Sequence, residues 1–185
     1  MKKIMFNSDI GLEYEVLHGN KTVTRRVVPE NALEDGIVDA GKHARYKVGE
    51  TVAVAQSYRK VADYMTENGM LESMLEPGTT LFREEYTGFG WNNKMYVKAK
   101  LMPHRIRITK VSMEWLQDIT DEDCMKEGVF EVGLFSEKKH YTYIGSKKWF
   151  DTPRDAFADI IERTCSKGLW DKNPLVYRYE FELLS

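Results

Sequence analysis

Ten residues near the end of the chain restrict its fold more than any other segment. The segment LVYRYEFELL (175–184) alternates between apolar and charged side chains from Tyr177 to Leu183. One face of the strand would carry the apolar side chains of Leu175, Tyr177, Tyr179, Phe181 and Leu183. The other face would carry the charged side chains of Arg178, Glu180 and Glu182. Alternation over this length predicts a half-buried β-strand whose apolar face covers a core.

Other segments predict further short strands. The β-branched run TVTRRVV (22–28) favours a strand, and KKIMF (2–6) favours a shorter one. In YKVGETVAVAQSY (46–58), Val52 and Val54 alternate with Ala53 and Ala55 after a turn at Gly49. The segment KMYVKAKLMPHRIRITKV (94–111) indicates two strands that are separated at Pro103.

Helix signals are fewer than strand signals. Residues 120–128 (TDEDCMKEG) predict a short helix with Thr120 as its cap and Gly128 as its stop. Thr152 and Pro153 predict the start of a longer helix that ends at Gly168. A brief helix is expected from a cap at Ser8 or Asp9, through Leu12 and Leu17, to a stop at Gly19. One or two short helices are expected within 59–93 before a turn at Pro77 and Gly78, and a polar loop is expected over 29–45. We therefore expect a single domain over 1–185, mainly β with flanking helices (α+β), built as a small β-barrel.

Composition excludes several classes of protein. The formal net charge of −2 argues against sequence-independent binding of polyanions, which usually requires a clearly basic domain. No apolar run reaches the ~20 residues that a membrane helix needs, and the first residues lack the apolar core of a signal peptide. Cys124 and Cys165 stand alone, as reduced thiols do, so a cytoplasmic location without disulfides is expected. The four histidines show no metal-ligand spacing, so we expect no metal.

The stretch HGNKTVTRR (18–26) gathers basic and hydroxyl side chains in nine residues. In a regular strand Lys21 and Thr24 would face opposite sides, so they converge only if Lys21 still belongs to a turn at Gly19. A lysine beside a threonine hydroxyl forms a base and nucleophile pair if the lysine pKa is lowered. Burial lowers it, and Arg25 and Arg26 act in the same direction. The alternative is a surface lysine on a solvated edge strand.

Glu127 is a second candidate because it ends the predicted acidic helix, where the helix dipole disfavours a negative charge. Such a carboxyl group suits general acid or base chemistry. The alternative, and the more common arrangement, is a carboxylate that is solvated like its acidic neighbours on the same helix. Arg105 and Arg107 share one face of a predicted strand with other basic residues, which fits either phosphate contacts or an ordinary solvated face. The three tryptophans in loop-like settings, Trp91, Trp149 and Trp170, suit either base stacking or the core.

Four segments in order resemble one known family. GNKTVTRR resembles the GxKxxTxR signature of the ASCH domain, a PUA-like β-barrel family related to RNA-binding PUA domains. YKVGETVAV, IRITKVSMEWLQDITDEDCMKEGV and NPLVYRYEFELL resemble its second strand, its strand with an acidic helix, and its closing strand. About two-thirds of the chain is covered, and residues 29–45, 59–93 and 129–150 look like insertions.

The resemblance implies a nucleoside, nucleotide or RNA as ligand. Small members of the family hydrolyse N4-acetylcytidine, and carried over by position their lysine, threonine and glutamate are Lys21, Thr24 and Glu127. Arg26 matches the arginine of the motif, whereas Arg25 stands where an apolar residue would be ordinary. The resemblance therefore predicts an amidohydrolase that needs no cofactor, with Arg26 orienting the ligand. The basic residues themselves make Arg25, Arg26, Arg105 and Arg107 the candidate ligand-binding residues. The alternatives are a non-catalytic RNA or nucleotide reader, and a protein-interaction role for the insertions.

Overall fold

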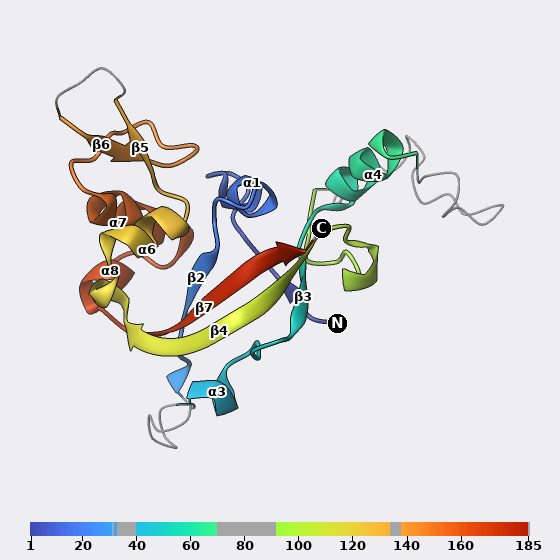
Figure 1. Cartoon of the computed structure of the whole chain (residues 1–185), viewed down its shortest axis with the longest axis horizontal. Coiled ribbons are helices and arrows are strands. Elements are labelled where there is room, and N and C mark those ends of the chain that lie inside the picture. Colours follow the sequence, from blue (N-terminus) through green and yellow to red (C-terminus); the bar gives the residue numbers. More distant parts are fainter. Residues whose placement is uncertain (31, 33–39, 70–91, 134–137, 185) are drawn as a thin grey trace.

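The fold is mixed α+β, with one main sheet and helices around it (Figure 1). The structure is a computed structural model that describes residues 1–30, 32, 40–69, 92–133 and 138–184. Its strands are β1 (Lys3–Ile4), β2 (Val23–Val27), β3 (Thr51–Val54), β4 (Arg105–Trp115), β5 (Phe130–Val132), β6 (His140–Thr142) and β7 (Leu175–Leu184). Its α-helices are α1 (Leu12–Leu17), α3 (Ala40–His43), α4 (Tyr58–Glu67), α6 (Asp121–Lys126), α7 (Pro153–Thr164) and α8 (Leu169–Lys172). None of these described helices is long and apolar enough to cross a bilayer.

The main sheet has the strand order β1-β3-β4-β7-β2, and β5 and β6 form a separate hairpin. β1 and β3 are parallel, and the other neighbours are antiparallel. In the described part of the chain no ladder joins the edge strands β1 and β2, so the sheet is open where a closed barrel was expected. A side chain bridges this opening instead, because Arg26 Nη2 on β2 donates to the carbonyl of Met5, just after β1, at 2.8 Å.

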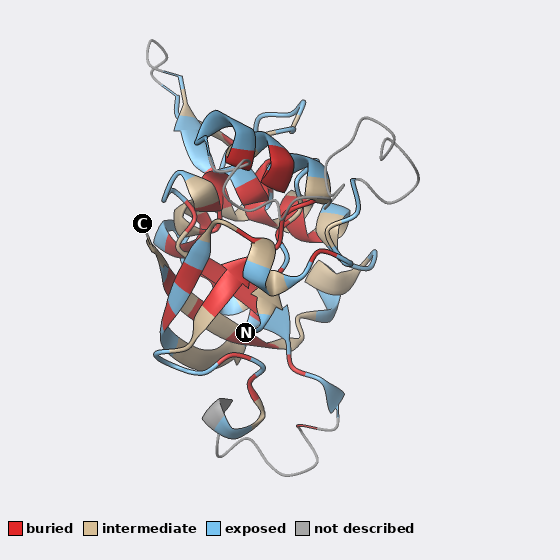
Figure 2. Ribbon diagram, turned by 90° about the vertical axis from the view of Figure 1, so that its right-hand side faces the viewer, coloured by how far each residue is buried: buried red, intermediate tan, exposed pale blue. Residues whose placement is uncertain are grey.

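The alternation of the last strand is confirmed. On β7, Tyr177, Tyr179 and Phe181 are buried, and β7 pairs with β4 along ten positions and with β2 along five. β7 is thus the interior strand that joins the long strand β4 to the edge strand β2 (Figure 1). Figure 2 shows that the buried residues gather on the strands and on the helices that pack beside them.

Strand β3 separates two hydrophobic cores. Val52 and Val54 face the main core, which includes Phe157 of α7, whereas Ala53 faces a second core. This second core contains Val61 and Met65 of α4 together with Val97 and Met102. Both faces of β3 are therefore buried, and α4, which begins the segment expected to be an insertion, covers one of them.

The predicted helix starts agree with the structure at two sites. Thr120 Oγ1 accepts from the backbone N–H of Asp123 at 3.1 Å, and Thr152 Oγ1 accepts from that of Asp155 at 3.1 Å. Three expectations were wrong. The N-cap of α1 is Gly11, without a side-chain hydrogen bond, where Ser8 or Asp9 was expected. Residues 94–101 form turns and a 3₁₀ turn (Ala99–Leu101) where a strand was expected, and α7 ends at Thr164, before the separate helix α8.

Gly11, which precedes α1, provides a test of this packing. Its φ is +73°, and a Cβ placed there would lie 2.3 Å from Ile144 Cβ. Gly11→Ala should lower the free energy of unfolding by about 1–2 kcal/mol for the left-handed backbone and about 1–3 kcal/mol more for the clash. Gly19→Ala is the matched control, since Gly19 has a φ of +75° and no atom within 4 Å. Urea unfolding of both variants measures the difference, and equal losses would contradict the packing of Ile144 on Gly11.

Candidate functional site

A cavity of about 990 Å³ lies along the free edge of β2. Its walls include Phe6 after β1, Thr24 on β2, and Ile160 on α7. Lys21 and Glu127 also line it. The structure therefore brings together the three residues expected to form the site, although Lys21 and Glu127 are 106 residues apart in the chain.

The turn before β2 delivers Lys21 to the cavity. Gly19 has a φ of +75°, and the backbone N–H groups of Asn20 and Lys21 both donate to the Glu15 carbonyl, at 2.9 and 3.0 Å. β2 begins only at Val23, so Lys21 belongs to the turn and escapes the alternation of the strand. The condition that Lys21 belongs to the turn is thus met, and Lys21 lines the same cavity as Thr24.

Lys21 and Glu127 form a buried ion pair. The ammonium group of Lys21 donates to the backbone carbonyl of Glu127 at 2.9 Å and also to its Oε2. Only 1% of the Lys21 side chain and 5% of the Glu127 side chain are exposed. Burial lowers the pKa of Lys21, Glu127 partly offsets this, and Arg26 and Arg25 lower the pKa further. The predicted direction of the Lys21 shift is confirmed.

A second cation holds the other oxygen of Glu127. Glu127 is the C-cap of α6, and its Oε1 accepts from Arg25 Nη1 at 3.0 Å. Its carboxylate is therefore fixed between Lys21 on one oxygen and Arg25 on the other. Neither oxygen needs a third partner to keep this orientation, so the group is already in place before any ligand binds.

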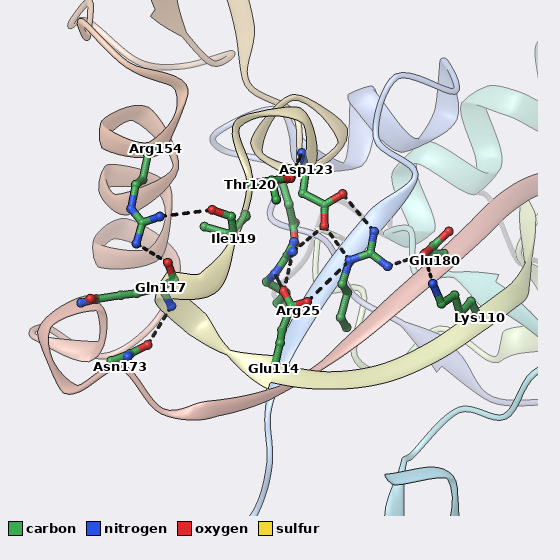
Figure 3. Close-up of polar contacts among 12 residues, drawn as sticks. Arg25, Lys110, Glu114, Gln117, Ile119, Thr120, Asp123, Arg154, Asn173 and Glu180 are labelled. Atoms are coloured by element: carbon green, nitrogen blue, oxygen red, sulfur yellow. Dashed lines mark hydrogen bonds and ion pairs between the residues drawn. The ribbon is translucent and has the colours of Figure 1, made fainter.

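Arg25 also holds two further carboxylates, as Figure 3 shows for Glu114 and Asp123. Its Nε donates to Glu114 Oε1 at 2.7 Å, and its Nη2 donates to Asp123 Oδ2 at 2.6 Å. Arg178 binds both oxygens of Asp123, at 2.6 and 2.9 Å. Arg25 was expected to bind the ligand, but carboxylates of the protein engage its Nε and both terminal nitrogens. It borders the cavity as a support for Glu127.

Thr24 is buried and borders the cavity. Among the described residues, no protein group forms a hydrogen bond with its hydroxyl, and the oxygen is not among the fully enclosed polar atoms that lack a partner. The hydroxyl therefore meets the cavity. The hydroxyl shares the cavity with Lys21, whose ammonium group donates to Glu127 and not to Thr24. A threonine nucleophile requires its base within hydrogen-bond reach, so attack by Thr24 would need the Lys21 amine to turn toward it.

Of the other three arginines predicted to bind the ligand, one lines the cavity and two do not. Arg26 lines the cavity, with its guanidinium 5.8 Å from the centre of the Phe6 ring. Arg105 and Arg107 lie on β4, are exposed, and line neither of the two cavities described. Arg107 instead forms a loose ion pair with Glu182, at 3.7 Å. The structure thus places Arg105 and Arg107 apart from the other site residues.

Several lining residues were not predicted from the sequence. Arg45 and Tyr46 follow α3, and Asn93 and Lys94 come from the segment before β4. No motif indicates them, because they reach the cavity only through tertiary packing. For Asp123 a signal existed. It lies four residues before Glu127, and such a spacing places two carboxylates on the same helix face, here toward β2.

The Asp123 cluster predicts how stability depends on pH. Burial would raise the pKa of Asp123, but hydrogen bonds from Arg178 and Arg25 outweigh burial and lower it from 3.8 to about 2. A lowered pKa contributes stability above the ordinary value, and that stability is lost as the pH falls. Unfolding measured between about pH 4 and about pH 2 should show this loss, and Asp123→Asn should be less stable at pH 7 but flatter across that interval. An unchanged acid slope in Asp123→Asn would contradict the assignment.

Within the described residues, no group of three or more histidine, cysteine or carboxylate side chains is placed to hold a metal ion. Both thiols are free. Cys124 is buried, and burial raises its pKa to about 12, whereas Cys165 is exposed and lines the cavity.

Comparison with protein families, curated proteins and solved structures found no match for this chain. The interpretation of the site therefore depends on its geometry and on the sequence motif.

Proposed function

We propose that the protein is an amidohydrolase that removes an acyl group from the exocyclic nitrogen of a cytidine. The observation that carries the proposal is the buried Lys21–Glu127 pair, which shares one cavity with the free hydroxyl of Thr24. Base, acid and nucleophile are the three groups that acyl transfer from nitrogen requires.

The ion pair supplies both a base and an acid by moving one proton. Transfer of a proton from the Lys21 ammonium to Glu127 Oε2 produces a neutral amine and a neutral carboxylic acid along the existing contact. Burial favours the neutral amine of Lys21, because it lowers the pKa of that group. No proton is gained from solvent or lost to it in this step.

In acylation, the Thr24 oxygen bonds the acyl carbon while its proton passes to the Lys21 amine. The bond between the acyl carbon and the exocyclic nitrogen breaks, and Glu127 protonates that nitrogen, so cytidine leaves as a neutral amine. The pair is then charged again, as ammonium and carboxylate. Arg26 lies two residues from Thr24 on the same strand and would orient the ligand.

In deacylation, water attacks the acyl–threonine ester. One proton of the water passes to the Glu127 carboxylate while the water oxygen bonds the acyl carbon. The bond between the acyl carbon and the Thr24 oxygen then breaks, and Lys21 returns a proton to that oxygen. Acetic acid leaves and ionises in solution, and the pair is again neutral. The cycle thus consumes one amide and one water molecule and needs no external acid or base.

We assign the chain to the PUA-like ASCH proteins on the same grounds. The GNKTVTRR motif, the interior position of β7 between β4 and β2, and the acidic helix that ends in Glu127 support this assignment. The open edge between β1 and β2 is a difference from a closed barrel, and it is where the cavity lies.

The test separates catalysis from binding. Purified protein should release cytidine and acetate from N4-acetylcytidine, with a rate that changes little with salt because this substrate is neutral. A non-catalytic reader of phosphates is the second candidate, favoured by the basic side chains of the cavity; it would show no turnover and steeply salt-dependent binding. Absence of turnover by the wild type would reject the amidohydrolase.

A further inference from the structure

The cavity is basic although the whole chain carries a formal charge of −2. Six basic side chains line it against two acidic ones; they are Lys3, Lys21, Arg25, Arg26, Arg45 and Lys94, and Asp9 and Glu127. A hollow lined by one sign of charge concentrates ligands of the opposite sign. The local imbalance therefore points to an anionic ligand.

Three of these cations are neutralised within the protein. Lys21 and Arg25 hold Glu127, and Lys94 pairs with Oε2 of the buried Glu13 at 3.0 Å. Among the described residues, no carboxylate lies within ion-pair distance of Lys3, Arg26 or Arg45. The ammonium group of Lys3 donates to three backbone carbonyls of the 94–97 segment. Lys3 therefore contributes positive charge to the cavity but no free hydrogen-bond donor for a ligand.

Arg26 and Arg45 differ from Lys3 in what their guanidinium groups do. Arg26 donates to two backbone carbonyls, at 3.0 and 2.8 Å, and keeps further N–H groups. The Arg45 side chain is exposed and lies over the Tyr46 ring, 5.6 Å from its centre. Guanidinium groups with unused donors bind phosphate oxygens in pairs of parallel hydrogen bonds.

The two arginines stand at a wall between two cavities. Arg26, Arg45 and Tyr46 line the main cavity and also a second one of about 270 Å³. Arg26 and Thr24 are two residues apart on β2, which separates them by about 7 Å on the same side of the strand. A ligand whose amide reaches Thr24 thus extends along β2 toward these arginines.

We propose that the ligand is a phosphorylated nucleoside whose phosphate binds between Arg26 and Arg45. The nature of the base rests on the proposed function, whereas the anion site rests on the charges and contacts of the cavity alone. A bare nucleoside leaves both arginines without a counter-ion. A cytidine nucleotide supplies one, and it fits a cavity at the large end of the range for small-molecule sites.

The test compares cytidine with cytidine 5′-monophosphate by calorimetry on the full chain. The nucleotide should bind at least about tenfold more tightly at low salt, since hydrogen bonds to charged groups add more than a neutral contact. Arg45→Gln should remove most of this advantage, while Arg45→Lys should keep part of it. Arg59→Gln, a matched change at an exposed arginine outside both cavities, should keep all of it.

Equal affinity for cytidine and its monophosphate, or full nucleotide affinity in Arg45→Gln, would overturn the anion site. Neither result depends on turnover. If the nucleotide binds more tightly than cytidine but N4-acetylcytidine is not hydrolysed, the anion site is supported and the amidohydrolase is rejected. A short cytidine oligonucleotide distinguishes the source of the phosphate. Tighter binding of the oligonucleotide than of the monophosphate assigns the phosphate to RNA, and weaker binding assigns it to a free nucleotide. Either result supports the anion site.

Discussion

Replacing Lys21 with methionine should lower kcat for N4-acetylcytidine hydrolysis by about 10²–10⁴-fold, the usual contribution of a positioned base. Lys21 is the cavity amine whose pKa is lowered by burial, and methionine keeps its apolar stem while removing the ammonium group. The variant leaves Glu127 paired with Arg25 alone. Release of cytidine, followed by chromatography, measures the effect.

Lys21→Arg separates the base from the counter-ion. Arginine keeps the positive charge beside Glu127 but does not lose its proton in a protein, so it cannot accept the proton of Thr24. Activity should therefore stay as low as in Lys21→Met, even where folding is retained. Lys98→Met, at an exposed lysine outside both cavities, is the control and should have wild-type kcat. Wild-type activity in Lys21→Arg would show that Lys21 serves only as a counter-ion.

Replacing Arg25 with methionine should lower the free energy of unfolding by about 3–5 kcal/mol, the range for breaking a buried ion pair. The change leaves Glu127 with Lys21 alone, removes one of the two arginines on Asp123, and leaves Glu114 with only its longer contact to Arg178, at 3.9 Å. Only 2% of the Arg25 side chain is exposed, so water does not replace the lost contacts. Denaturant unfolding at pH 7 measures the loss.

Arg107→Met is the matched control for Arg25→Met. Arg107 pairs with Glu182 at 3.7 Å, and both side chains are about half exposed, so its loss should cost less than about 1 kcal/mol. A single ammonium group cannot hold all three carboxylates. Arg25→Lys should therefore recover only part of the stability, and it should shift the pH profile of kcat. Equal losses in Arg25→Met and Arg107→Met would contradict the network around Glu127.

Local patterns predicted the elements whose sequence alone decides their structure. The alternation of β7 and the caps of α6 and α7 were confirmed, because each depends on neighbours within a few residues. The segment 94–101 was not predicted correctly. Its apolar residue Val97 packs in the second core below α4, and Lys3 binds the carbonyls of this segment, both of which are tertiary effects.

The site was predicted in part. Lys21, Thr24 and Glu127 followed from one motif and one helix end, and the turn at Gly19 brings Lys21 to Thr24's cavity as required. The role of Arg25 was not foreseen, since its neighbours suggested a surface cluster and its partners Glu114 and Asp123 lie about 90 or more residues away. Arg45 has no local signal either, because only the packing of its segment beside β2 makes it a wall of the cavity.

The most direct measurement is the release of cytidine from N4-acetylcytidine by the wild type, Thr24→Ala and Thr22→Ala in parallel. Thr22 is the matched control, because it is the same residue type two positions earlier and does not line the cavity. The wild type and Thr22→Ala should release cytidine and acetate in equal amounts, and Thr24→Ala should lose activity by about a thousandfold or more. Undiminished release by Thr24→Ala, or none by the wild type, would contradict the assignment of Thr24 as the nucleophile.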